Sequence, residues 1–272
     1  ESAVADLGAP AVLKPLGLSA SQGVIRVDNP SEAPAAAERI RRILITEGRS
    51  PGEPILVERF VPGVEIAVEG LLLDGRLEVL ATFDKPDPLD GPYFEETMLI
   101  TPSRLHPEMI EEVVRVTERA TAALELSEGP IHAELRVDGA RVVLLEVAAR
   151  SIGGLCGRSL RFGLLGTSLE NLILRRSLGM PVTGLRRERV ASGVMMLPIP
   201  AEGTLRSVGG TEAALSVPGV TDLELSIHPG ETIRRLPEGN RYLGFLFAKG
   251  DTPQAVEGSL REGHGKLDFV ID

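Results

Sequence analysis

Two glutamates, Glu134 and Glu146, stand on neighbouring apolar segments that predict the two strands of a β-hairpin. The segments are 130–137 and 141–147, and the Asp-Gly pair between them is a strong signal for a tight turn. A simple register would place Glu134 opposite Leu144, with Glu146 two positions further along. Because side chains alternate between the two faces of a strand, both carboxylates are expected on one face.

Two carboxylates on one face of an apolar hairpin need a compensating cation, because an uncompensated charge in such surroundings is costly. Magnesium, which proteins bind through carboxylates together with phosphate oxygens, is the natural occupant, and Mn²⁺ is the alternative ion. The competing interpretation of the pair is a solvated face. The apolar flanks Leu144, Leu145 and Val147 argue against it.

Arg150 lies four residues after Glu146 and begins a loop that contains Gly153-Gly154. A guanidinium beside a metal site can hold a phosphoryl or carboxylate group through two parallel hydrogen bonds. Adjacent glycines let the backbone approach a ligand closely. An exposed loop arginine and an ordinary turn are the alternatives.

Lys14 ends a predicted strand, 11–14, and is followed by a small-residue loop, 17–23, and a second strand, 24–27. A lysine in this place can neutralise phosphates while the N–H groups of the loop cover them. The segment is not a Walker A sequence, and an ordinary hairpin is the alternative.

Glu58 and Glu65 are seven positions apart, on predicted strands 55–59 and 64–73. A carboxylate can accept hydrogen bonds from both ribose hydroxyls, and the backbone at a strand end can read the edge of adenine. Two surface glutamates are the alternative.

The remaining pattern predicts elements that could position these residues. Strand 64–73 pairs with 76–83 through Asp74-Gly75, and residues 84–104, rich in proline and acidic residues, are expected to form a long loop. From about residue 190, short strands and Pro-Gly turns predict a separate α+β unit. Apolar periodicity predicts helices over 31–46, 107–124, 167–178 and about 252–262.

Composition restricts the class of protein. The chain has 272 residues, 43% of them hydrophobic, which suits one or two domains, and its net charge of -10 argues against non-specific nucleic-acid binding. No apolar run is long enough to cross a membrane. The single cysteine, Cys156, forms no intrachain disulfide and fits a reducing cytoplasm. We interpret Cys156 as a small buried residue and His132 as a core or supporting histidine.

In order and spacing, these segments resemble the ATP-grasp superfamily. The stretches Val12–Val24 and Val57–Glu65 resemble its phosphate segment and its adenine and ribose segment, and His132–Glu134 and Leu145–Arg150 resemble its metal-ligand strands with the arginine that follows. The resemblance implies ATP and Mg²⁺ as cofactors. It assigns phosphate binding to Lys14, Ser19, Ser21 and Gly23, adenine to Glu58, Phe60 and Val61, ribose to Glu65, magnesium to Glu134 and Glu146, and the acyl phosphate or substrate carboxylate to Arg150, with Lys14 and Arg150 as the catalytic cations.

Within the superfamily, the chain resembles carboxylate–amine ligases of the L-amino-acid ligase type over nearly its whole length. Phe83-Asp84-Lys85 and Glu95-Glu96-Thr97 resemble the substrate-side segment of that group. The fold expected from the resemblance is a two-lobed α+β ATP-grasp fold with a small C-terminal α+β domain. The expected limits are 1–64 for an incomplete small lobe, 65–185 for the large lobe and 186–272 for the C-terminal domain.

The implied reaction joins a small amino-acid-like carboxylate to an amine by way of an acyl phosphate. Where the family usually has an asparagine metal ligand, this chain has Ala148, which puts a second magnesium in doubt. The chain does not begin with Met, so we expect an N-terminal domain upstream or on a split partner chain. The alternatives are a non-catalytic nucleotide-binding or scaffold domain, and a biotin-carboxylase-like or purine-pathway ligase. A homodimer through the C-terminal domain is a further expectation.

Overall fold

The computed structural model describes residues 1–163, 166–182 and 186–272. The first part is a small lobe whose three strands lie in the order β2-β1-β3 and pair antiparallel. One helix, α2, packs on this sheet through Ala36, Ile40 and Leu44. The elements of the lobe are α1 (Ser2–Leu7), β1 (Ala11–Pro15), β2 (Ile25–Val27), the 3₁₀ turn η1 (Pro30–Glu32), α2 (Ala33–Thr46) and β3 (Ile55–Arg59).

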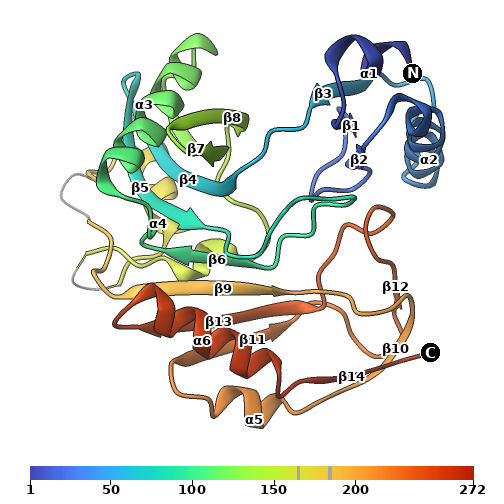
Figure 1. Cartoon of the computed structure of the whole chain (residues 1–272). Helices are drawn as coiled ribbons and strands as arrows, with labels where there is room; N and C mark the ends of the chain where they lie inside the picture. Colours follow the sequence, from blue (N-terminus) through green and yellow to red (C-terminus); the bar gives the residue numbers. More distant parts are fainter. Residues whose placement is uncertain (164–165, 183–185) are drawn as a thin grey trace.

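The second part is an eight-stranded antiparallel sheet in the order β11-β13-β9-β6-β5-β4-β7-β8 (Figure 1). Helix α3 covers one face, where Val113 packs with Ile66, Val68 and Leu135. On the other face, Cys156 of η2, Leu160 just after it and Leu172 of α4 belong to a second core. The elements up to this point are β4 (Val64–Leu73), β5 (Arg76–Asp84), β6 (Met98–Thr101), α3 (Pro107–Ala123), β7 (Gly129–Asp138), β8 (Arg141–Ala148), η2 (Cys156–Ser159) and α4 (Leu169–Ser177).

The C-terminal residues extend this large sheet and add a second, smaller one. Strands β9, β13 and β11 continue the large sheet beyond β6, while β12, β10 and β14 form a three-stranded sheet. Helix α6 packs against β9 and β13 through Val256 and Leu260. The elements of this part are β9 (Ala191–Leu197), β10 (Gly203–Gly209), α5 (Thr211–Leu215), β11 (Val220–Leu225), β12 (Thr232–Ile233), β13 (Gly244–Gly250), α6 (Pro253–His264) and β14 (Asp268–Ile271).

The α+β class and the predicted strands and helices are confirmed to within a few residues, with two corrections. The segment 84–104 is not a continuous loop, because it contains β6, which joins β5 to β9. The C-terminal unit does not have a sheet entirely of its own, since three of its strands belong to the large sheet. The expected domain limits remain predictions, and the one at residue 185 lies outside the described residues. In the described part of the chain, no helix is long and apolar enough to span a bilayer.

Candidate active site

One face of the sheet around β4 and β7 carries a row of charged side chains. The register pairs Glu65 with Arg136, Ala67 with Glu134, and Glu69 with His132. Residues two apart on a strand share a face, so all of these side chains except the small Ala67 bring polar groups to one surface. The opposite face of the same strands carries the apolar residues that pack under α3.

The predicted pair Glu134 and Glu146 lies directly opposite across β7 and β8. The expected offset of two positions is wrong. A β-bulge between Glu134 and Leu135 shifts the register, so that Leu135, and not Glu134, lies opposite Leu144. The bulge therefore brings the two carboxylates closer together than simple hairpin pairing would.

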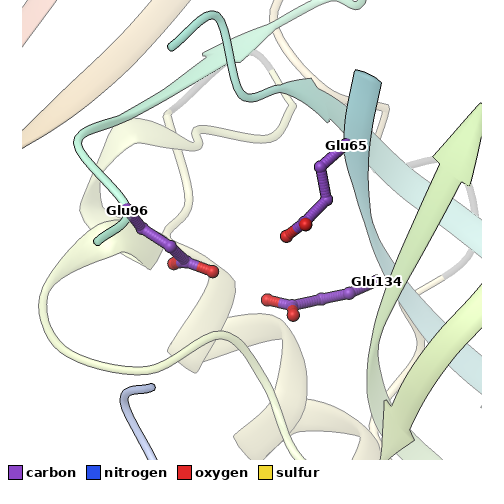
Figure 2. Close-up of side chains that lie close together, drawn as sticks. All are labelled: Glu65, Glu96 and Glu134. Carbon is purple, nitrogen blue, oxygen red and sulfur yellow. The ribbon is translucent and has the colours of Figure 1, made fainter. Parts of the chain in front are cut away.

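Lys85 is the centre of the charged cluster. Its ammonium lies 2.6 Å from Glu65, 2.5 Å from Glu96 and 2.9 Å from Glu134, and its side chain is only 3% exposed. Figure 2 shows the three carboxylates converging from separate segments of the chain. Arg136 adds a second cation, with its Nε 3.0 Å from the other oxygen of Glu65.

These contacts determine the charge states of the cluster. Burial opposes the charge on Lys85, but the three carboxylates outweigh it and raise the pKa of Lys85 well above its ordinary value. Burial likewise opposes ionisation of Glu134, yet Lys85 and His132 lower its pKa well below the usual range. Burial raises the pKa of Glu96 to about 7, with the charge of Glu134 adding to the effect and Lys85 opposing it. Glu134 is therefore the firmly anionic member of the cluster.

His132 ties Glu134 to a second buried carboxylate. Its Nδ1 lies 2.5 Å from Glu69 and its Nε2 3.3 Å from Glu134. Burial opposes the charge on His132, but these two hydrogen bonds raise its pKa to about 9. The same oxygen of Glu69 accepts a hydrogen bond from the Ile152 N–H at 3.0 Å, which links the cluster to the loop after Arg150.

The donor set fits a hard divalent cation. Glu65, Glu96 and Glu134 each offer a carboxylate oxygen, and these oxygens lie within 4.8 Å of one another. In this structure the cation that joins them is the Lys85 ammonium, which a metal ion at the same oxygens would have to displace. Glu146, opposite Glu134, is exposed, and both partial desolvation and the charge of Glu134 raise its pKa. An added cation would relieve this repulsion.

The residues predicted to bind nucleotide lie on the small lobe and on the segment that joins it to β4. The Nζ of Lys14 is 2.6 Å from Glu58, because the register of β1 and β3 places these side chains diagonally on one face. The positive charge of Lys14 also acts on Glu146, where it opposes the rise in the pKa of that carboxyl group. Val61 is half-buried beside Phe60. The Phe60 ring has the Arg26 guanidinium 4.3 Å from its centre and Phe94 stacked at 6.5 Å.

The predicted phosphate loop is tightly turned. Ala20 and Ser21 both have φ of 56°, in the left-handed region that non-glycine residues seldom occupy, and Gly23 has φ of 74°. Ser19 is exposed and Ser21 is half-buried. Arg150 is exposed as well, and its guanidinium donates to the Ser151 carbonyl at 2.9 Å.

Sequence reasoning did not single out Glu69 and Arg136 as site residues, and it placed Lys85 and Glu96 only in a substrate-side segment. A signal was available for the first two, because Glu65 and Glu69, and likewise His132, Glu134 and Arg136, follow the two-residue period of a strand face. For Lys85, only the pairing of β4 with β5 reveals that it lies beside Glu65.

Two pockets on the described surface lie away from the charged cluster. One, of about 610 Å³, is lined by Asp74, Arg176 and Met180, and the other, of about 480 Å³, by Val4, Leu13 and Val57 of the small lobe. Neither is lined by the charged cluster. The chemistry of the cluster, and not the size of a hollow, therefore identifies the candidate site.

Comparison with known proteins gives two family matches. Residues 7–159 match the ATP-grasp domain, and residues 195–272 match the L-amino acid ligase C-terminal domain 2. Among solved structures, the L-amino acid ligase from Bacillus licheniformis superimposes with a TM-score of 0.82 at 26% identity, over 99% of this chain and 67% of that one.

Similar curated proteins include a ligase, a synthase and an uncharacterized protein. Alanine–anticapsin ligase of Bacillus subtilis is 28% identical over 56% of this chain and 35% of its own length. Carnosine synthase 1 of Gallus gallus is 30% identical over 76% of this chain and 23% of its own length. An uncharacterized protein of Sinorhizobium fredii is 26% identical over 98% of this chain and 54% of its own length. The chain thus spans about half or less of the length of these curated relatives.

Proposed function

Because the chain belongs to the ATP-grasp family and carries the C-terminal domain of L-amino acid ligases, we propose that it is an ATP-dependent carboxylate–amine ligase acting on amino-acid-like substrates. The observation that carries the proposal is the convergence of Glu65, Glu96 and Glu134 on Lys85, with Glu146 opposite Glu134. A cytoplasmic location is part of the same prediction.

The proposed reaction has two steps. A carboxylate oxygen of the first substrate attacks the γ-phosphorus of ATP, the bond between that phosphorus and the β,γ-bridging oxygen breaks, and ADP leaves. The amine of the second substrate then attacks the acyl carbon, phosphate leaves with the bonding electrons, and the amine loses a proton to solvent. Both steps move charge among phosphate oxygens, so positioning and charge neutralisation carry most of the catalysis.

The residues of the chain have distinct parts in this scheme. Lys14 and Arg150 neutralise the phosphate oxygens, and the loop 17–23 covers the phosphates and keeps water away from the acyl phosphate. The backbone at Phe60 and Val61, together with Glu58, contacts adenine, and Glu65 accepts the ribose hydroxyls. The last role requires Lys85 and Arg136 to share Glu65 with the nucleotide.

Magnesium would be held by Glu134 and Glu146. When bound, the ion neutralises charge on the phosphate oxygens of ATP. The bulge at Glu134 places these two carboxylates face to face, and the Glu69–His132 pair fixes the orientation of Glu134.

The test is an assay of the purified protein with ATP, magnesium and pairs of amino acids. We expect ADP and phosphate to form only when a carboxylate and an amine are both supplied. Hydroxylamine in place of the amine should trap the acyl phosphate as a hydroxamate. Formation of AMP and pyrophosphate would contradict the proposed mechanism.

One observation favours a second candidate, a nucleotide-binding domain without ligase activity. The position opposite His132 is Ala148, which offers no side-chain ligand for a second cation. In that case the protein binds Mg-ATP, yet ATP is not consumed with any tested pair of carboxylate and amine.

A further inference from the structure

The phosphate loop is held from outside the small lobe by residues of the C-terminal domain. The Gly23 N–H donates to the Pro237 carbonyl at 2.9 Å. The buried side chain of Gln22 donates to the Glu238 carbonyl at 2.8 Å and receives a longer hydrogen bond of 3.4 Å from Asn240. The chain segment that makes these contacts connects β12 to β13 and extends toward the small lobe (Figure 1).

An ion pair fastens the same segment to helix α2. The guanidinium of Arg39 meets both carboxylate oxygens of Glu238, at 2.6 and 2.8 Å. Arg39 also donates to the hydroxyl of Tyr93, in the segment between β5 and β6. Two parallel hydrogen bonds between planar groups define orientation as well as distance, so this pair fixes how the segment lies on the small lobe.

The conformation of the loop itself requires such support. Consecutive left-handed residues at Ala20 and Ser21 are strained, and strained backbone persists only where its surroundings enforce it. Within the small lobe, the Gln22 side chain also donates to Glu47 at 2.9 Å and its backbone N–H donates to the Ser19 carbonyl at 3.2 Å. The other described partners of the Gln22 side chain, and the partner of the Gly23 N–H, lie in the segment 237–240. Segment 237–240 therefore provides many of the contacts that hold the strained loop in this conformation.

We propose that residues 237–240 act as a clasp that positions loop 19–23 over the nucleotide phosphates, with Arg39 and Glu238 as its fastening. The clasp rests on the proposed function, because it assigns the C-terminal domain a part in ATP binding. Arg39 and Glu238 are positioning residues: they act on the loop and do not touch the reacting atoms.

The experiment compares Glu238→Ala with the exchanged pair Arg39→Glu/Glu238→Arg. Amide hydrogen exchange, measured without nucleotide, should speed up about fivefold at Gln22, Gly23 and Val24 in Glu238→Ala, as expected for loss of a partly exposed ion pair, and should be slowed again in the exchanged pair. The control is Arg206→Gln, which breaks the exposed pair with Asp272 in the same domain. Exchange in the loop unchanged by Glu238→Ala would overturn the clasp.

Steady-state kinetics then test the link to the nucleotide. Glu238→Ala should raise KM for ATP about fivefold and change kcat by less than about twofold, because a smaller fraction of the protein has the loop in place. An unchanged or lowered KM would contradict the positioning role. If the wild type does not bind ATP at all, the proposed function fails, whereas the exchange measurement still decides whether the clasp exists.

Discussion

At the scale of single residues, Glu134 is the most constrained side chain of the candidate site. Lys85 holds it from one side and His132 from another, and Glu146 faces it across the hairpin. Such an arrangement keeps Glu134 ionised and oriented. We therefore expect substitutions around Glu134 to change ligand binding as well as stability.

Replacing Glu146 by Gln should lower kcat/KM by about 100-fold or more, because it removes a charged ligand from a proposed magnesium site while keeping the shape of the side chain. Glu146 is exposed and has no ion-pair partner among the described residues, so the fold should not change. The matched control is Glu111→Gln on the exposed side of α3. Near-normal turnover of Glu146→Gln would contradict the assignment of Glu146 as a magnesium ligand.

His132 should make stability depend on pH. Its pKa of about 9 in the folded protein exceeds the ordinary value of 6.5, so its stabilising effect is full below about pH 6.5 and is lost as pH rises through about 9. The total effect is roughly 3 kcal/mol. Chemical unfolding of the metal-free protein from pH 6 to 10 should show a decline that is shallower in His132→Gln. Equal slopes for the two proteins would contradict this charge state.

The residue pattern predicts part of this site. The shared face of Glu134 and Glu146 follows from strand alternation alone. Their direct opposition depends on a β-bulge that the residue types at this position do not predict. The place of Lys85 depends on the pairing of three strands and on Glu96, which comes from a separate segment (Figure 2). Long-range register of this kind cannot be deduced from local sequence.

At the scale of elements, the entry into β4 depends on Gly63. Its φ is 106°, and a Cβ at this position would lie 2.2 Å from the carbonyl oxygen of Val137. Gly63 also accepts a hydrogen bond from Arg136, so the turn and the charged cluster share a backbone contact. The position of Glu65, two residues later, is therefore set by this turn.

Gly63→Ala should destabilise the protein by about 2–4 kcal/mol, because it combines left-handed strain with a backbone clash. Gly75→Ala is the control, since Gly75 has a similar positive φ of 78° and open space around it, and should cost about 1 kcal/mol. Denaturant unfolding measures both. Equal losses would show that the contact with Val137 is unimportant.

Element boundaries were largely predictable where turn chemistry is strong. Asp74-Gly75 joins β4 to β5, as expected from such a pair. The turn between β7 and β8 is one residue later than predicted, at Gly139-Ala140, because Asp138 still pairs with Arg141. Strand β6 escaped prediction because it has only four residues, Met98–Thr101, inside a segment rich in proline and acidic residues. Its pairing with β9, nearly a hundred positions later, is what makes it a strand.

At the scale of the whole molecule, the continuous sheet joins the large lobe to the C-terminal domain. Met196, Phe245 and Phe247 from the C-terminal strands pack in the same hydrophobic core as Leu71 and Phe83. The two parts should therefore unfold together. Composition indicated a second unit after residue 190, but only the strand order reveals that it completes the core of the first.

Phe247→Ala should lower the free energy of unfolding by about 3–5 kcal/mol, as for a large aromatic residue removed from a core. Hydrogen exchange should speed up in β5 and β6 as well as in β13, because all three share the packing. Leu124→Ala, an exposed position, is the control. Faster exchange confined to the C-terminal strands would contradict a shared core.

The central claim is that this chain binds ATP through a magnesium site on Glu134 and Glu146, and thermal unfolding tests it most directly. The melting temperature is measured with ATP and magnesium, with magnesium alone, and with ATP and a chelator. At 100 times its Kd, Mg-ATP should stabilise the fold by about 2.7 kcal/mol, or a few degrees, and the rise should disappear in Glu134→Gln/Glu146→Gln. A rise that persists with the chelator or in the double variant, or none in the wild type, would contradict the claim.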